Sequence, residues 1–369
     1  MGKIKVKFFD FLNKNSTISI LSSIVCIILG ILVGFLLLLV TKPGESLIGI
    51  TSIIFKPFSP TFFNKYFIGA IVKSVPLIFS GLSVAFAFKT GLFNIGTPGQ
   101  MLVGGFTAVA ISLLSPIHNG FTMILAIIGA IIAGAIWGLI VGFLKAKFNI
   151  NEVIAAIMMN YIGTYLVIWL VQKDGIYNAA YAMSKPLPSY AIIPTLGLDK
   201  LFPGSYLDIS IFIAIAIAIL LYFVLNKTTL GFELKATGFN KDAANNASMK
   251  YKRNIIISMT IAGALAGLGG AILYMSSYGG GIKPEITLLS AGFDGISVAL
   301  LASLNPIGAI FSGIFIQYIR NGGQILRIFT SYSTEIADII IAIIIYFSAL
   351  TALIVSFFNK RRQNRKEGK

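Results

Sequence analysis

A long apolar run from Ile18 to Val40 contains no charged residue and decides the solvent in which the chain folds. The hydrocarbon core of a bilayer is about 30 Å thick, so one helical crossing needs roughly 20 consecutive apolar residues. Further apolar runs follow along the 369 residues. The sequence therefore predicts an all-α, polytopic membrane protein with about ten transmembrane helices, at 18–40, 67–88, 98–114, 121–144, 153–172, 209–225, 254–276, 287–303, 306–319 and 335–357.

The composition agrees with a membrane protein. Hydrophobic residues make up 56% of the chain and charged residues only 11%, against about 25% charged residues in soluble domains. Lys and Arg number 29 against 13 Asp and Glu. When the N-terminus is placed inside the cell, about two thirds of the basic residues fall on the inner side, where positive charge accumulates in membrane proteins. We therefore predict a multi-pass protein of the cell membrane with both termini in the cytoplasm.

The whole chain, 1–369, is interpreted as a single transmembrane domain. A cytoplasmic segment, 1–17, precedes the membrane domain 18–357, and a basic tail, 358–369, follows it. Two connections are large: an outer loop at 173–208 and a polar, basic inner loop at 226–253. Neither loop is long enough to form a separate globular domain.

The motifs of common enzymes are absent from the sequence. The chain has one cysteine, Cys26, and one histidine, His118, which removes most catalytic and metal-binding combinations. It contains no Walker A pattern for binding ATP, no H-E-x-x-H and no G-x-S-x-G. A membrane enzyme is not excluded by these absences, but we expect a chain that is not an enzyme, with no catalytic residue, no metal and no cofactor.

Two segments, 67–172 and 254–357, have corresponding layouts and opposite predicted orientations, which suggests an inverted repeat. Each contains a glycine-interrupted stretch, at 91–100 in the first and at 279–281 and 291–295 in the second. Irregular backbone at membrane depth survives only where protein or a water-filled cavity satisfies it. Both stretches are candidates for a substrate path, although glycines also serve to bring helices close together. We prefer this packing role for Gly104, Gly105, Gly263, Gly267, Gly269 and Gly270.

Polar residues at membrane depth are costly, which makes them functional candidates. Asp294 and, less deeply, Lys73 are the ionisable ones, and Lys73 can instead extend toward the outer surface. The amides that fall in the suspected path would hydrogen-bond a polar, uncharged ligand, and an aromatic ring would stack on a flat one. The predicted substrate path contains Phe93, Asn94, Gln100, Asn160 and Asp294. For each amide, a hydrogen bond between helices is the alternative role.

The inner loop contains an unusual stretch at 231–247. Asn240 is a suitable N-cap, and Asp242 suits the first turn of a helix because the helix dipole favours an anion there. A short amphipathic helix of this kind can dock in a groove of a soluble partner. The alternative is a solvated loop with one helical turn.

This stretch resembles the coupling loop of ABC importer permeases, in the branch that serves simple sugars, branched-chain amino acids and nucleosides. The matching positions are Gly231, Leu234, Ala236, Gly238, Asn240, Ala243 and Ala244. Four more segments resemble the family in the same order along 67–357, namely 91–100, 151–161, 258–271 and 292–306. Asn151-Glu152-Val153-Ile154 with Asn160-Tyr161 looks most like the nucleoside permeases.

The resemblance implies a machine of several chains. Two permease subunits would form the channel, a separate cytosolic ATPase would dock on the coupling positions named above and drive alternating access, and an extracellular substrate-binding lipoprotein would deliver a nucleoside. Pro98 stands where these permeases often carry Glu, which weakens any transfer of substrate specificity and is consistent with a heterodimer of unequal permeases. A simple sugar or riboflavin remains an alternative cargo. An ATP-independent secondary transporter or channel, and a membrane-embedded enzyme, remain alternative classes.

Overall fold

The computed structural model describes residues 15–349, and these are almost entirely helical. Seven helical segments in this range are long and apolar enough to cross a membrane: Ile24–Thr41, Pro60–Phe88, Thr97–Leu114, Gly120–Phe148, Glu152–Val171, Ser210–Lys227 and Tyr251–Met275. The prediction of an all-α, polytopic membrane protein is confirmed. The basic segment 1–14 and the tail 350–369 lie outside the described residues.

The three remaining predicted crossings correspond to helices that do not meet the same length and polarity criteria within the described residues. Helix α15 (Ser290–Leu301) is apolar but has only 12 residues. Helix α16 (Pro306–Phe329) contains Arg320 and Arg327, and α17 (Glu335–Ala349) reaches the end of the described range. The total of ten transmembrane helices therefore remains a prediction.

The chain divides into two compact units, one made of residues up to Phe62 together with residues from Tyr318 onward, and one made of Phe63–Gln317. In the first unit, α2 (Asn15–Thr41) packs along α17, with Gly34 of α2 against the side chain of Ile340. The segment after α2 contains the short helix α3 (Ser46–Ile54), which lies between the predicted crossings 18–40 and 67–88 and was not predicted. Tyr332 donates a 2.8 Å hydrogen bond to Leu38 O, which ties the region before α17 to α2.

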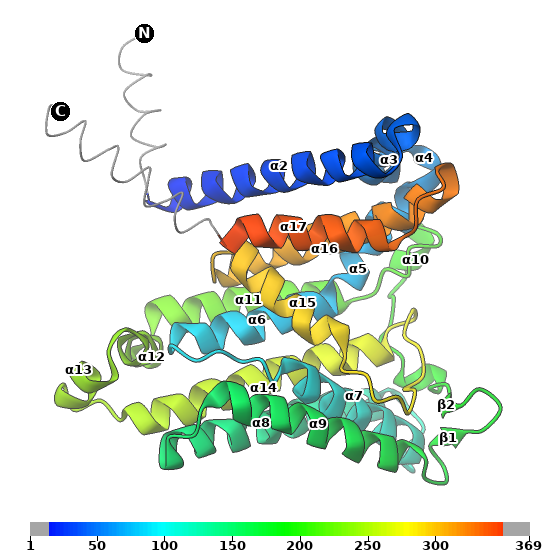
Figure 1. The fold of residues 1–369 in the computed structure, drawn as a ribbon. Helices are drawn as coiled ribbons and strands as arrows, with labels where there is room; N and C mark the ends of the chain where they lie inside the picture. The colour runs from blue at the N-terminus through cyan, green and yellow to red at the C-terminus, as the bar shows by residue number, and fades with distance from the viewer. Residues whose placement is uncertain (1–14, 350–369) are drawn as a thin grey trace, which may run out of the picture. The chain divides into compact units, whose positions relative to one another are not determined.

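The second unit holds the remaining long helices (Figure 1). They are α6 (Val75–Lys89), α7 (Thr97–Leu114), α8 (Gly120–Phe148), α9 (Glu152–Val171), α11 (Ser210–Lys227) and α14 (Tyr251–Met275). A π-helical turn, η3 (Phe63–Ile68), and α5 (Gly69–Lys73) lead into α6. One end of this unit carries α12 (Thr229–Phe239) and α13 (Lys241–Asn246), and we call it the α12 end.

The opposite end of the second unit carries the hairpin β1 (Tyr177–Asn178) and β2 (Met183–Ser184), and we call it the hairpin end (Figure 1). It includes the predicted outer loop 173–208, in which α10 (Leu198–Leu201) is the short helix. His118 Nδ1 lies 2.9 Å from the hydroxyl of Tyr190, so the single histidine joins the α7–α8 turn to this loop.

Glycines bring α8 and α14 into backbone contact. A Cβ atom added to Gly138 would lie 3.0 Å from the Cα of Gly263, and one added to Gly267 would lie 3.0 Å from the Cα of Gly134. Small residues at such crossings allow the close packing that stabilises helices in lipid. The packing role expected for Gly263 and Gly267 is confirmed.

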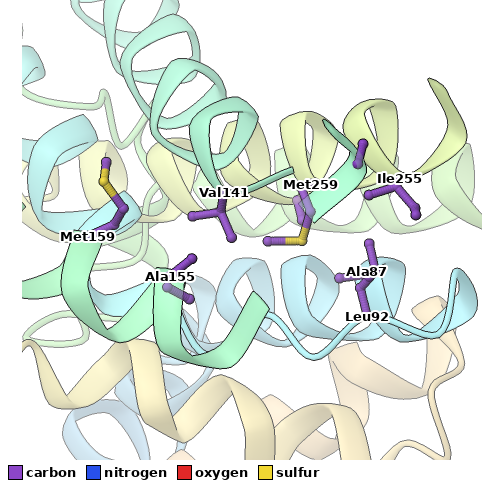
Figure 2. Close-up of a cluster of buried hydrophobic side chains, with 10 residues drawn as sticks. Ala87, Leu92, Val141, Ala155, Met159, Ile255 and Met259 are labelled. Carbon is purple, nitrogen blue, oxygen red and sulfur yellow. The ribbon is translucent and has the colours of Figure 1, made fainter. Parts of the chain in front are cut away.

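Apolar clusters fill the second unit, and two of them lie near its ends. Toward the α12 end, one cluster contains Leu92 and residues of α6, α8, α9 and α14, among them Met159 and Met259 (Figure 2). At the hairpin end, α7 and α9 pack through residues such as Phe106 and Val167. The backbone between α6 and α7 therefore passes through well-packed protein and not through a loose surface loop.

Candidate functional site

The helix interruption predicted after residue 90 is present between α6 and α7. Gly91 has φ of +72°, a conformation that favours glycine. Its N–H donates to Phe88 O at 3.0 Å, and the N–H of Leu92 donates to Ala87 O at 3.1 Å, so two carbonyl groups at the end of α6 are satisfied. Helix α7 then begins at Thr97, with Pro98 in its first turn. We call residues 90–96 the broken stretch.

Asn94 and Gln100 hold the broken stretch from inside. Both side chains are fully buried. The amide nitrogen of Asn94 donates to Gln100 Oε1 at 2.9 Å and to Ser83 Oγ at 3.0 Å. Gln100 returns a bond from Nε2 to Asn94 Oδ1 at 3.1 Å, and Gly96 N donates to the same oxygen at 3.2 Å. The two amides therefore satisfy each other and the backbone of the stretch.

Asn160 of α9 holds the same stretch from the other side. Its Oδ1 accepts from Gly99 N at 3.0 Å, and its Nδ2 donates to Ile95 O at 3.0 Å. The side chain is buried, so all three amides of the predicted path bond to protein groups. Phe93 is half-buried, with its ring centroid 5.2 Å from that of Phe88.

The second glycine-interrupted region lies directly against the first. Gly292, in the first turn of α15, touches Pro98, and a Cβ atom at Gly292 would overlap the proline backbone. The carbonyl of Gly292 accepts a 2.9 Å hydrogen bond from Ser80 Oγ of α6. Pro98, the departure from the family pattern, is thus a packing partner of α15. Asp294 is half-buried on the next turn of α15.

The predicted coupling positions split into buried anchors and exposed residues. Asn240 caps α13, with its Oδ1 accepting from the N–H groups of Asp242 and Ala243 at 2.9 and 3.0 Å, which confirms the predicted cap. Buried positions hold the two helices onto the unit, and they are Gly231, Leu234 and Ala244. Asn240 and Ala243 are exposed, and Ala236 is half-buried.

Gly238 joins α12 to the broken stretch. A Cβ atom at Gly238 would lie 2.5 Å from Lys89 O and 2.9 Å from Gly91 N, so only glycine permits this approach of the two backbones. Asn254 of α14 donates from Nδ2 to Thr237 Oγ1 at 3.1 Å. Burial, together with the nearby charge of Lys235, lowers the pKa of Lys89 at this junction.

Sequence analysis missed two aromatic side chains of α12. Phe239 is 91% exposed, and Phe232 is 63% exposed. The family pattern leaves both positions unspecified, so nothing in the motif distinguished them from residues that pack inward. Both side chains are large, apolar and open to solvent on a polar segment, which makes them candidates for a contact with another protein.

A cavity of about 430 Å³ opens at the hairpin end. Leu102 of α7, Thr164 and Ile168 of α9 and Tyr274 of α14 line it, with residues of the connection that precedes α15. A neighbouring cavity of about 250 Å³ shares Tyr274 and lies beside the hairpin. Neither cavity includes an amide of the predicted path.

Asp208 is a buried carboxylate just before α11. Its Oδ1 accepts from Ser210 N at 2.9 Å, while Oδ2 has no hydrogen-bond partner in the described part of the chain. Burial raises the pKa of Asp208, and the hydrogen bonds from Ser210 oppose this effect. No ion pair involves Asp208 among the described residues.

The comparisons with known proteins agree with the fold. Residues 66–349 match the family described as branched-chain amino acid transport system / permease component. The chain is 36% identical over 340 residues to the guanosine ABC transporter permease protein NupP of Bacillus subtilis, covering 89% of this chain and 93% of the relative. It is 36% identical over 284 residues to the nucleoside ABC transporter permease protein NupB of Lactococcus lactis, covering 76% and 78%.

A glucose ABC transporter permease protein of Haloferax volcanii, TsgB13, is 30% identical over 304 residues, covering 79% of this chain and 76% of the relative. A second permease protein of Bacillus subtilis, NupQ, is 28% identical to this chain, and a second permease protein of Lactococcus lactis, NupC, is 27% identical. No solved structure matches the chain significantly.

Replacing Asp208 by Asn should remove a pH-dependent loss of stability. A carboxyl group with a raised pKa holds its proton longer in the folded chain than in the unfolded one, so stability falls as pH rises from the unfolded pKa through the folded one. We expect Asp208→Asn to melt several degrees above the parent at pH 8, with the gap narrowing toward pH 5. Melting in detergent would measure this, with exposed Asp199→Asn as the matched control; equal effects of both changes would contradict the assignment.

Proposed function

Because this chain belongs to the family of branched-chain amino acid transport system permease components, we propose that it is the membrane subunit of an ABC importer that moves a nucleoside into the cell. The observation that carries the proposal is the junction at Gly238, where the exposed segment α12–α13 meets the broken stretch. A docking surface and an internal helix interruption are thereby joined through direct backbone contact. That arrangement suits a permease driven by a separate protein.

The docking surface consists of Phe232, Phe239 and the exposed face of α13. Phe239 presents nearly its whole side chain to solvent, and Asn240, which follows it, fixes the start of α13. We propose that a cytosolic ABC ATPase receives this segment in a groove. Movement of α12 would then displace Lys89–Gly91, because at Gly238 the two backbones are in direct contact.

The amide side chains that bond to the broken stretch would make it a rigid connection between α6, α7 and α9. Asn94 and Gln100 bond to each other, and Asn160 bonds the stretch to α9. A displacement at Gly91 would therefore be passed to α7 and α9 as a unit. We propose that this displacement alternates access to the path, in which Phe93, Asn94, Gln100, Asn160 and Asp294 would shape the passage.

The proposed cargo is a nucleoside. The names of NupP and NupB refer to guanosine and nucleosides, and both proteins match most of this chain. Half-buried Phe93 offers a ring face beside the path. The relative named for glucose supports a simple sugar as the second candidate.

We further propose an assembly of unlike permeases. The paired permease proteins NupP with NupQ and NupB with NupC support a second, different subunit, and Pro98 in place of the family's Glu agrees with that inequality. The assembly would also contain the ATPase and an extracellular substrate-binding lipoprotein. In this arrangement α12, α13 and both termini face the cytoplasm.

Phe239→Ala should weaken docking of the ATPase without disturbing the fold. The side chain contributes almost nothing to the interior, since it is 91% exposed, so its removal leaves the packing of α12 intact. Loss of a buried aromatic anchor at an interface typically costs about 2 kcal/mol or more, equivalent to roughly a 30-fold loss of affinity. Co-purification of the ATPase from membranes would measure this effect.

The matched control is Phe223→Ala, an exposed phenylalanine on α11 outside the proposed docking surface. It should leave co-purification unchanged. If Phe239→Ala retained the ATPase as well as Phe223→Ala did, the docking surface would be misplaced.

Uptake measurements test the function itself. Vesicles containing the complete complex should accumulate radiolabelled guanosine only with ATP and the binding lipoprotein present, and uptake should survive a protonophore. ATP-independent uptake that the protonophore abolishes would favour a secondary transporter. Accumulation of glucose in preference to guanosine would favour the sugar alternative.

A further inference from the structure

Helix α9 presents a stripe of aromatic residues on its exposed face. Tyr161, Tyr165 and Trp169 follow each other at four-residue spacing, so their side chains lie on one side of the helix. They are 42%, 54% and 58% exposed. Asn160, the preceding residue, lies about 100° away around the helix and is buried. The exposed face of α9 therefore includes Tyr161 and Tyr165.

Tyr161 lies near the middle of α9, and Tyr165 lies one turn closer to its C-terminal end. This helix has 20 residues, Glu152–Val171, and at 1.5 Å per residue Tyr161 lies about 14 Å from either end. Tyrosine normally sits at the membrane interface, where its hydroxyl meets water. Neither hydroxyl makes a hydrogen bond within the described part of the chain. A hydrocarbon environment would leave both groups without a partner.

Other exposed helix faces in the same unit are chemically different. Along α8 the large exposed side chains are apolar, namely Ile124, Ile128, Ile132, Ile136, Leu139 and Phe143. Along α11 the exposed residues Ile219 and Leu220 are apolar too, while Tyr222, closer to the end of the helix, is 39% exposed. These faces suit contact with lipid chains. The exposed face of α9 also carries the apolar residues Ile154, Met158 and Ile162, so the tyrosine hydroxyls near its middle are what distinguish it.

The stripe continues from the larger cavity at the hairpin end. Thr164 and Ile168 line that cavity of about 430 Å³, and they lie one helical turn from Tyr161 and Tyr165 on the surface of α9. Thr287 and Ser290 add hydroxyl groups to its wall. The cavity therefore borders the tyrosine side of α9.

We propose that Tyr161 and Tyr165 form the wall of the cargo path at mid-membrane, where the flat base of a nucleoside stacks on their rings. Stacking of a nucleobase on an aromatic ring tolerates different bases, because every base has a π face. The two hydroxyls can each donate and accept hydrogen bonds with polar groups of the cargo. The inference rests on the proposed function for the identity of the cargo, but not for the presence of a polar path along α9.

Cysteine accessibility in the complete complex tests the position of the path. The described cysteine, Cys26, is buried, so the parent chain gives the background rate of labelling. Tyr161→Cys and Tyr165→Cys should react with a charged, water-soluble thiosulfonate at least ten times faster than Ile132→Cys, the lipid-facing control on α8. Excess guanosine should slow both reactions.

Three results would overturn the inference. Labelling as slow as that of Ile132→Cys would place the stripe in lipid. Oxidative cross-linking of Tyr161→Cys to the second permease, with no reaction with the reagent, would make the stripe a subunit contact. Rapid labelling that guanosine leaves unchanged, in a complex that does accumulate guanosine, would show that the cargo does not contact the stripe.

Transport kinetics separate this inference from the proposed function. Tyr165→Ala should raise the KM for guanosine uptake at least fivefold, and Tyr165→Phe should raise it less because the ring remains. Tyr222→Ala, an exposed tyrosine of α11 that does not line the cavity, is the matched control and should have no effect. Normal guanosine uptake by Tyr161→Ala and Tyr165→Ala would contradict the inference alone, whereas a parent complex that never carries nucleosides would contradict the proposed function.

Discussion

Backbone groups that leave a helix inside packed protein must find hydrogen-bond partners there, because a buried polar group without a partner is costly. The broken stretch between α6 and α7 meets this requirement with buried amide side chains. Asn94 supplies an acceptor to Gly96 N, and Asn160 supplies both an acceptor to Gly99 N and a donor to Ile95 O. Without these side chains the interruption would leave buried polar groups unsatisfied, each at a cost of about 1–3 kcal/mol. The rest of the site depends on these hydrogen bonds, because they offset the free-energy cost of interrupting the helix.

The interruption also determines what can move together. Gly91 at its start touches Gly238 of α12, Pro98 after it touches Gly292 of α15, and Asn160 joins it to α9. Close backbone contacts and buried hydrogen bonds transmit displacement well because packed interiors have little free volume. A force applied to the exposed α12–α13 segment therefore has a short, continuous route to the helices that flank the proposed path.

Local patterns predicted much of this arrangement. The apolar runs located seven long helices, and Asn240 was recognised as the cap of α13 because capping depends on neighbouring residues alone. The direction of the amide side chains was not predictable, since Asn160 and Tyr161 are adjacent and only tertiary packing decides which one faces inward. The exposure of Phe239 was missed for the same reason. Helix α3 was missed because nine residues are too few to suggest a crossing.

The central claim is that the α12–α13 segment faces the cytoplasm, where an ATPase can bind it. A cysteine introduced by Asn245→Cys, at an exposed position of α13, tests this most directly. The account predicts that a membrane-impermeant maleimide leaves it unmodified in intact cells and labels it once the membrane is permeabilised. Labelling in intact cells would place the segment outside and contradict the account.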